Sequence, residues 1–307
     1  MKTLYFSTVR SPRIKELDKP KAGVLAYVED PTEEELQELV EIHGLDIDLL
    51  NDGLDPNEAP RIEKLDGRVY IYSRFVLKEE EKGTTSPILI IFGLDMVYVV
   101  TKKSFTDFKK LINRDDIITS MRAKLLLQIL GTVNSGYMQR INTIGKRING
   151  MRAQLDKAHI DNKVFVAVID IEEAINDILL ALDPMNTLLN SLLTGKIIKL
   201  YEEDQDLVED LELSSDELSR IASSQLMTLK NIREAYSTMM ANNLNKVFKL
   251  MTSITILMGI FTLITGIYSM NIALPAENSP NAFWIILGVT SAFIGFASYL
   301  FKKNKWF

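Results

Sequence analysis

The sequence predicts an α/β amino-terminal domain, a long helix that continues into a membrane span, and a two-helix transmembrane hairpin at the carboxyl end. The domain is indicated by short β-rich segments before residue 104, and the long helix by an interval of 63 residues between Gly195 and Gly259 without glycine or proline. The hairpin is indicated by two long uncharged segments after Lys249. Of the 35 basic and 41 acidic residues, 32 and 40 lie in residues 1–249, so the acidic, water-compatible composition belongs to that part.

The amino-terminal part combines strand signals with one clear helix signal. Residues 23–28, 69–77, 87–92 and 96–101 are short segments rich in β-branched and aromatic residues, as strands are. In the segment 32–44, Thr32 can cap a helix, Glu35 can complete a capping box, and Gly44 can end the helix. We therefore expect an α/β subdomain over residues 1–103.

From residue 104 onward the pattern becomes helical. Apolar residues recur at steps of three and four over residues 118–155, which predicts a long amphipathic helix. A second helix is expected over about 162–182, because the residue before Pro184 should avoid helical geometry. These two helices form the predicted helical hairpin, residues 104–195.

The 63 residues after Gly195 could form one helix about 95 Å long, at 1.5 Å per residue. The alternative is two helices that meet at residues 213–217, where a pair of serines could cap a new helix. The sequence favours one helix, because neither glycine nor proline accompanies those serines. We expect a stalk helix over residues 196–246 that runs directly into the first membrane span.

Two uncharged segments, residues 250–276 and 282–301, are 27 and 20 residues long. A helix needs about 20 apolar residues to cross a bilayer, and two such segments in succession argue against a buried soluble helix. We expect a first transmembrane helix over 247–271, a loop over 272–281, a second helix over 282–301 and a basic tail over 302–307.

Lysines flank the outer ends of this hairpin, whereas the loop contains one acid and no base. The lysines are Lys246, Lys249, Lys302, Lys303 and Lys305. By the positive-inside rule, both termini of this multi-pass protein are expected in the cytoplasm, with the hairpin in the cell membrane. The lipid bilayer is thus one expected partner.

The composition excludes several classes of protein. Without cysteine there are no disulfides or thiolate metal sites, and the two histidines form no metal-binding pair. The acidic balance argues against nucleic acid as a partner. The first residues lack a continuous apolar segment, so we expect no secretory signal. No nucleophile and base occur in a recognisable pattern, so an enzyme is not expected.

One side of the first span is small or hydroxylated, and the opposite side, with Leu257, Ile264 and Ile267, is bulky and apolar. At 100° per residue, the first side collects Asn245, Phe248, Thr252, Thr255, Gly259, Thr262 and Gly266. Such a face can pack closely against another helix, or it can line a water-filled path. The amides of Asn245 and Asn271 favour a path, because an amide in hydrocarbon is costly without partners or water, although Asn271 can also cap the helix.

Two helices cannot enclose a pore, so conduction would require several copies around an axis, each contributing its polar face. That face carries no acid. The choice of ion would therefore depend on amide, hydroxyl and carbonyl dipoles that act on a hydrated cation. Mg²⁺ holds its water shell tightly and is often bound through it, so an asparagine ring suits this ion.

The segment "GIYSMN", the second span and the terminal "FKKNKWF" resemble the CorA-type magnesium channels, whose first span ends in a Tyr-Gly-Met-Asn signature. The upstream "NKVFKLMTSITILMGIFTLITGIY" is similar to that family in register, and the likeness in layout covers the whole chain. The resemblance implies a homopentameric funnel whose stalk helices surround the axis. It also implies Mg²⁺ as transported and regulatory ion, with Co²⁺ and Ni²⁺ as further candidates and no organic cofactor.

Carried over by position, the resemblance assigns roles to residues of the first span. Its selectivity filter would comprise Tyr268, Ser269, Met270 and Asn271. Its pore-lining and gate residues would be Asn245 as a cytoplasmic polar ring, Phe248 and Met251 as a hydrophobic gate, and Thr252, Thr255, Gly259 and Thr262 along the conduit.

The family's regulatory cation lies between acids of neighbouring subunits, which the resemblance places at Asp52 and at Asp210, with Glu209 beside it. Two carboxylates that face each other repel unless a cation lies between them. The alternative is that these are ordinary solvated acids of an acidic domain.

Three departures from the family pattern leave other functions open. Ser269 replaces the motif glycine, the first span lacks the family's proline, and Glu277 is the single acid of the loop, so the loop attracts cations weakly. One alternative is a transporter of Zn²⁺ or another metal in the same superfamily, although zinc prefers the N and S ligands that are scarce here. The other is a non-conducting scaffold or sensor.

Overall fold

The computed structural model describes residues 2–78, 84–155, 162–272, 280–304 and 306. The chain divides into two compact units, Met1–Ile232 and Arg233–Phe307. Most of the predicted loop, including Glu277, and Lys305 and Phe307 of the predicted tail lie outside the described residues.

The first unit contains one seven-stranded sheet with the order β2-β1-β3-β7-β6-β5-β4. Neighbouring strands are antiparallel except for β3 and β7, which are parallel. The strands are β1 (Lys2–Thr8), β2 (Ser11–Leu17), β3 (Leu25–Glu29), β4 (Arg61–Leu65), β5 (Arg68–Val76), β6 (Thr85–Phe92) and β7 (Val97–Thr101).

The four predicted strands correspond to β3, β5, β6 and β7, which occupy the interior of the sheet together with β1. The sequence did not predict β1, β2 or β4. Strands β2 and β4 form the two edges, and their sequences, SPRIKEL and RIEKL, are rich in charge. Charged side chains protect an edge strand from pairing with other chains, and they also remove the apolar signal by which a strand is recognised.

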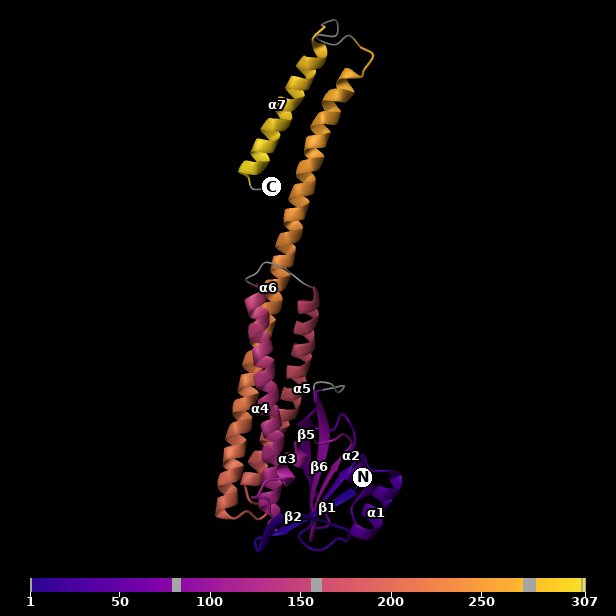
Figure 1. Ribbon diagram of the computed structural model, residues 1–307, viewed down its shortest axis with the longest axis vertical. Helices are drawn as coiled ribbons and strands as arrows, with labels where there is room; N and C mark the ends of the chain where they lie inside the picture. Colours follow the sequence, from indigo (N-terminus) through magenta and orange to yellow (C-terminus); the bar gives the residue numbers. More distant parts are fainter. Residues whose placement is uncertain (1, 79–83, 156–161, 273–279, 305, 307) are drawn as a thin grey trace. The chain divides into compact units, whose positions relative to one another are not determined.

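Helices cover both faces of this sheet (Figure 1). Along β5, Tyr70 and Tyr72 point to the face covered by α1 (Glu33–His43) and α2 (Ile47–Asp52), and the Tyr72 hydroxyl donates to the Leu49 carbonyl at 3.0 Å. Ser73 lies on the opposite face, 3.5 Å from Met185 Sδ. The helices of that face are α3 (Phe108–Ile112), α4 (Arg122–Leu155) and α5 (Asn162–Leu193). The alternation follows from the two-residue period of a strand, which places neighbouring side chains on opposite faces.

Helix α1 begins and ends as the sequence predicts. The Thr32 hydroxyl accepts from the Glu35 amide, and the Glu35 carboxylate accepts from the Thr32 amide, which completes a capping box. Gly44 ends the helix with φ at 63°, in the left-handed region that glycine adopts without a steric penalty.

The prediction that the second long helix ends before Pro184 is wrong, because α5 continues through that proline to Leu193. A proline removes one helical hydrogen bond, here the one that would end on the Leu180 carbonyl, at an exposed residue. Beyond the proline the helix buries a further set of apolar side chains, and this burial offsets the lost bond. They are Met185, Leu188, Leu189 and Leu192.

The long helix is continuous, as predicted: α6 runs from Glu202 to Tyr268, 67 residues or about 100 Å. The serine pair at its possible break lies within the helix and packs against its neighbours. Ser214 Oγ accepts a hydrogen bond from Asn134 Nδ2 of α4 at 2.9 Å, and Ser215 is fully buried. Small side chains here allow α4 and α5 to lie alongside the amino-terminal part of α6 (Figure 1).

We expect Gly53→Ala to lower the thermal unfolding midpoint of the detergent-solubilised protein. A Cβ at Gly53 would lie 2.6 Å from Cδ2 and 2.7 Å from Cβ of the fully buried Leu89, and such overpacking costs about 1–3 kcal/mol. Gly53 has φ at −64°, so the penalty is steric. The control is Gly150→Ala in α4, where a Cβ meets nothing within 4 Å and alanine should raise the midpoint. An unchanged midpoint in Gly53→Ala would contradict this packing.

Candidate functional site

The second unit, Arg233–Phe307, contains the carboxyl part of α6 and α7 (Ala282–Lys303). Both helices are long and apolar enough to cross a membrane, and only 6% of each apolar window is buried within the single chain. Apolar surface of this extent needs a bilayer or other copies of the chain to cover it.

One stripe of α6 is less exposed than the rest of its apolar segment: Ser253, Leu257, Ile260 and Ile264, spaced by three and four residues. On α7 the less exposed stripe contains Ile286, Thr290 and Ile294. Ser253, the first residue of the α6 stripe, is 0% exposed, and Thr290, in the middle of the α7 stripe, is 4% exposed. The two helices run beside each other (Figure 1), so the stripes identify their contact. Small residues at such a contact let membrane helices approach closely.

The small and hydroxylated side of α6, called its polar face below, does not coincide with the stripe that contacts α7. With 100° per residue, the centre of that face is roughly 140° away from the stripe that contacts α7. Its small and hydroxylated residues are all exposed in the single chain: Thr252, Thr255, Gly259, Thr262 and Gly266. Helix α7 therefore does not cover the polar face, and packing within the hairpin does not explain it.

Two of the hydroxyl groups on this face, those of Thr255 and Thr262, donate their hydrogens to their own helix. Thr255 Oγ1 donates to the Met251 carbonyl, and Thr262 Oγ1 to the Met258 carbonyl, both at 2.9 Å. A hydroxyl has one hydrogen and two lone pairs, so each oxygen is left as an acceptor. Acceptors suit a hydrated cation, whose water ligands direct their hydrogens outward.

Towards the amino end of the same face lie Asn245, Phe248 and Met251, all exposed. Phe248 and Met251 are large apolar side chains one turn before the hydroxylated region. Copies of α6 placed around an axis with this face inward would form an apolar constriction there, with an amide ring before it.

Helix α6 ends at Tyr268, and the turn after it satisfies two of the last carbonyls, those of Gly266 and Ile267. The Ser269 amide and hydroxyl both donate to the Gly266 carbonyl, at 3.3 and 2.8 Å, and the Met270 amide donates to the Ile267 carbonyl at 3.2 Å. Among the described residues, Asp30 and Asp66 are the only non-glycine residues with a positive φ, so Ser269 has an ordinary negative φ. The backbone at Ser269 therefore does not require glycine, and its hydroxyl supplies a cap that glycine lacks.

Asn271 follows this turn and is exposed. Its side-chain amide has no hydrogen-bond partner within the described part of the chain, so it does not cap α6 there. Among the described residues, no group competes with a ligand or with another copy of the chain for this amide.

In the first unit, Asp52 already has a cationic partner. Its Oδ2 lies 2.8 Å from Arg61 Nη2, and Arg61 also pairs with Glu58 and Glu63 and lies 3.9 Å above the Tyr72 ring. Partial burial lowers the pKa of Arg61, but its bonds to Glu63 and Asp52 outweigh this effect and raise the pKa above its ordinary value. Arg61 was not among the residues predicted from the sequence, although the acids on both sides of it in "NEAPRIEK" are a signal for such a network.

Glu209 and Asp210 lie on α6 and are exposed. Within the described ranges, no group of three or more histidine, aspartate and glutamate residues is arranged to hold a metal ion. A cation site at Asp52 or Asp210 would therefore need ligands beyond one copy of this chain, or water.

We expect Ser253→Leu to lower the thermal unfolding midpoint of the detergent-solubilised protein, because the larger side chain cannot fit between α6 and α7. Thr265→Leu is the matched control: it adds similar bulk at an exposed position of the same helix, where the hydroxyl also bonds its own backbone. Equal midpoints for the two variants would show that Ser253 does not lie in a tight contact.

Comparison with known proteins agrees with this arrangement. The cobalt/magnesium transport protein CorA of Methanocaldococcus jannaschii is 24% identical over 288 residues, which cover 90% of this chain and 89% of that protein. The complete structure of the CorA magnesium transporter from the same organism matches all of this chain and 99% of its own, with a TM-score of 0.86 and 21% identity. The full-length CmaX protein has a TM-score of 0.74 at 14% identity, and the match covers 99% of this chain and 97% of that chain.

These likenesses show that the fold extends over the soluble unit, the long helix and the apolar helix pair. The family model described as CorA-like Mg²⁺ transporter protein matches residues 25–303, which is nearly the whole chain. The chain therefore belongs to the family of CorA-like Mg²⁺ transporter proteins.

Proposed function

We propose that this chain forms a homopentameric divalent-cation channel in the cell membrane, with Mg²⁺ as its main cargo and both termini in the cytoplasm. The observation that carries the proposal is the polar face of α6, which α7 leaves uncovered and which ends near Asn271, whose amide has no partner among the residues that the structure describes. Family membership supports transport of a divalent cation. The flanking lysines support the orientation.

In the proposed pore, the hydrated ion meets the polar groups of α6 in sequence. A ring of Asn271 amides at the outer mouth accepts hydrogen bonds from the water ligands of the ion, so the ion keeps its hydration shell. The acceptor oxygens of Thr255 and Thr262 then replace bulk water along the conduit. Phe248 and Met251 close the path when their ring is narrow enough to exclude water.

We also propose a regulatory cation between Asp52 of one subunit and Asp210 of the next, with Glu209 beside it. Bound Mg²⁺ offsets the repulsion between the carboxylates and holds the closed arrangement. In the single chain Asp52 is paired with Arg61, so the cation competes with that guanidinium for the carboxylate. Arg61 would thereby set how much Mg²⁺ is needed for closure.

The geometry at Ser269 supports a conducting protein over a scaffold that has lost conduction. Its backbone has no positive φ, so serine causes no strain there, and its hydroxyl bonds the last turn of α6. The selectivity motif therefore tolerates serine without a change in the helix end.

We expect Asn271→Ala to reduce Mg²⁺ influx into proteoliposomes by at least tenfold, because the mouth loses the acceptors that hold the hydrated ion. Influx is measured with an enclosed Mg²⁺ indicator under an inward gradient. The control is Asn304→Ala, which removes the same side chain after the end of α7 and should leave influx unchanged. Equal influx through wild type and Asn271→Ala would refute the proposed filter.

We expect Arg61→Gln to lower the internal Mg²⁺ concentration that half-closes the channel by about 1.5- to 5-fold, because a partly exposed ion pair contributes about 0.2–1 kcal/mol. The measurement is current or flux at graded internal Mg²⁺, with Asp52→Asn expected to change the half-closing concentration in the opposite direction.

Arg13→Gln removes the same charge from an exposed strand and serves as the control for this series. If the Arg61→Gln and Arg13→Gln channels are half-closed at the same internal Mg²⁺ concentration, Arg61 does not compete with the cation for the carboxylate of Asp52.

A further inference from the structure

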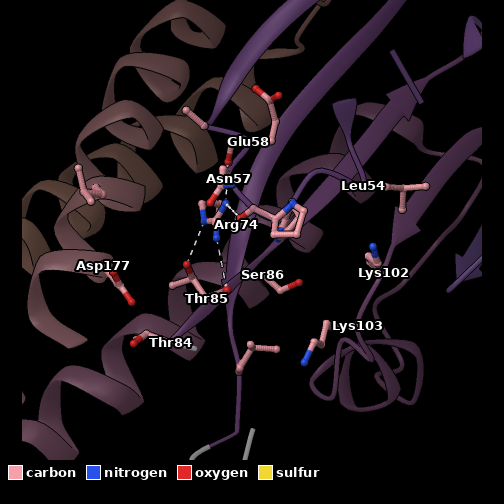
Figure 2. Close-up of a pocket in the computed structure, with 15 residues that line it drawn as sticks. Leu54, Asn57, Glu58, Arg74, Thr84, Thr85, Ser86, Lys102, Lys103 and Asp177 are labelled. Carbon is pink, nitrogen blue, oxygen red and sulfur yellow. Dashed lines mark hydrogen bonds between the residues drawn. The ribbon is translucent and has the colours of Figure 1, made fainter. Parts of the chain in front are cut away.

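Serines in the amino-terminal half of α6 meet one asparagine from each of two neighbouring helices. On α4, Asn134 Nδ2 donates to Ser214 Oγ at 2.9 Å, and on α5, Asn186 Nδ2 donates to Ser219 Oγ at 3.3 Å. Asn134 and Ser219 are buried, so each contact has a partner inside the packed helices. These contacts lie in the first unit, where the long helices run side by side (Figure 1), whereas the large cavity of that unit lies beside the sheet (Figure 2).

Each of these asparagines uses its amide nitrogen and leaves its amide oxygen unpaired. Among the described residues, the buried Oδ1 atoms of Asn134 and Asn186 accept no hydrogen bond. Ser215 is 0% exposed, and its hydroxyl also has no partner in the described part of the chain. Buried polar groups nearly always find partners, because an unpaired group loses the hydrogen bonds that it makes in water. The unpaired groups at this level of α6 therefore require an explanation.

Other hydroxylated residues of α6 show how such a group is usually satisfied. Thr228 Oγ1 donates to the Ser224 carbonyl at 3.0 Å, and Thr238 Oγ1 donates to the Glu234 carbonyl at 2.9 Å. The Ser215 hydroxyl makes no such bond to its own helix within the described ranges. Its hydrogen can therefore be donated to a neighbouring helix.

The Ser215 hydroxyl and Asn186 Oδ1 are complementary, because one has a hydrogen to donate and the other accepts. Ser215 precedes Ser219 by four residues, so their Cβ atoms lie about 5–6 Å apart on one side of α6. Asn186 bonds Ser219 and therefore lies beside this side of the helix. A displacement of α6 along α5 by about 1–2 Å, which is a common scale for helix shifts, would bring the Ser215 hydroxyl towards the unpaired oxygen.

We propose that α6 has two positions against α5, which differ in the bonds of Asn186. In the position described here Asn186 bonds Ser219 alone, and in the other position it also accepts from Ser215. The regulatory cation proposed at Asp210 favours one position over the other, so this inference rests on the proposed function.

The geometry of α6 connects this contact to both ends of the proposed mechanism. Asp210 lies five residues before Ser215, about 7.5 Å along the same helix, so a cation bound there acts on α6 close to the contact. Helix α6 is continuous to Tyr268, so a displacement of its amino-terminal half is transmitted along the helix. The exchange of bonds at Asn186 would thereby accompany opening and closing.

The first test is the thermal unfolding midpoint of the full-length protein in detergent, measured in EDTA and in millimolar Mg²⁺. We expect Ser215→Ala to lower the midpoint in one of the two conditions and to leave it unchanged or raise it in the other, because the hydroxyl is bonded in only one position. In an Asn186→Ala background this dependence on Mg²⁺ should disappear, since the acceptor is gone.

Two matched variants accompany this test. Ser219→Ala should lower the midpoint in both conditions, because Asn186 bonds Ser219 in both positions. Ser223→Ala makes the same change at an exposed position one turn later and should have the same effect in both conditions. If the effect of Ser215→Ala is also the same in EDTA and in Mg²⁺, the proposal is overturned.

The second test is flux into proteoliposomes at graded internal Mg²⁺. Ser215→Ala should change the half-closing concentration by about two- to tenfold, the equivalent of one hydrogen bond, whereas Ser219→Ala should leave it nearly unchanged. Equal half-closing concentrations in Ser215→Ala and wild type would contradict the two positions while leaving the channel intact. A midpoint effect of Ser215→Ala that depends on Mg²⁺ in a protein without flux would instead support the two positions and reject conduction.

Discussion

Polar groups within a membrane must find their partners inside the protein, because hydrocarbon offers none, and this constraint shapes α6. Its backbone is satisfied by a continuous helix from Glu202 to Tyr268. The hydroxyls of Ser253, Thr255 and Thr262 bond carbonyls of their own helix. Each therefore enters the apolar segment without an unsatisfied donor, and an uncharged helix can still present acceptor oxygens along one face. The proposed conduction depends on this arrangement.

In the first unit, two arginines hold the polar groups of the segment between α2 and β4. Arg61 pairs with Asp52 and Glu58, while Arg74 holds the carbonyls of Pro56 and Glu58. Two arginines thus fix the loop between α2 and β4. The proposed regulatory carboxylate, Asp52, lies at one end of this loop.

The helices and strands could be predicted from the sequence where local signals and tertiary packing agree. The interior strands β3, β5, β6 and β7, the capped helix at Thr32–Gly44 and the uninterrupted α6 were predicted because their patterns reflect burial or caps directly, whereas the interior strand β1 was missed. The edge strands β2 and β4 were missed, since their exposure replaces apolar residues by charges. The end of α5 was misplaced because burial beyond Pro184 outweighs the local preference of proline, which no local rule measures.

For the candidate site, the residues of the polar face could be predicted from periodicity and resemblance, but two features could not. The contact of Ser253 with α7 depends on which side of α6 its neighbour occupies, and a helical wheel does not contain that information. The partner of Asp52 depends on a loop that returns Arg61 to the end of α2. The roles of Asn271, Asp52 and Asp210 depend on neighbouring subunits and stay predictions.

The separation of the two faces of α6 has a consequence for how such proteins diversify. The stripe that contacts α7 and the face proposed to meet the ion lie roughly 140° apart on one helix. Substitutions on one face then leave the other nearly unaffected, because side chains that share no partners contribute almost independently to stability. Natural selection could alter the face proposed to meet the ion while the hairpin keeps its fold. Ser269, just after the end of α6, bonds the Gly266 carbonyl through its hydroxyl and has no positive φ, so a side chain at this position fits the end of the helix.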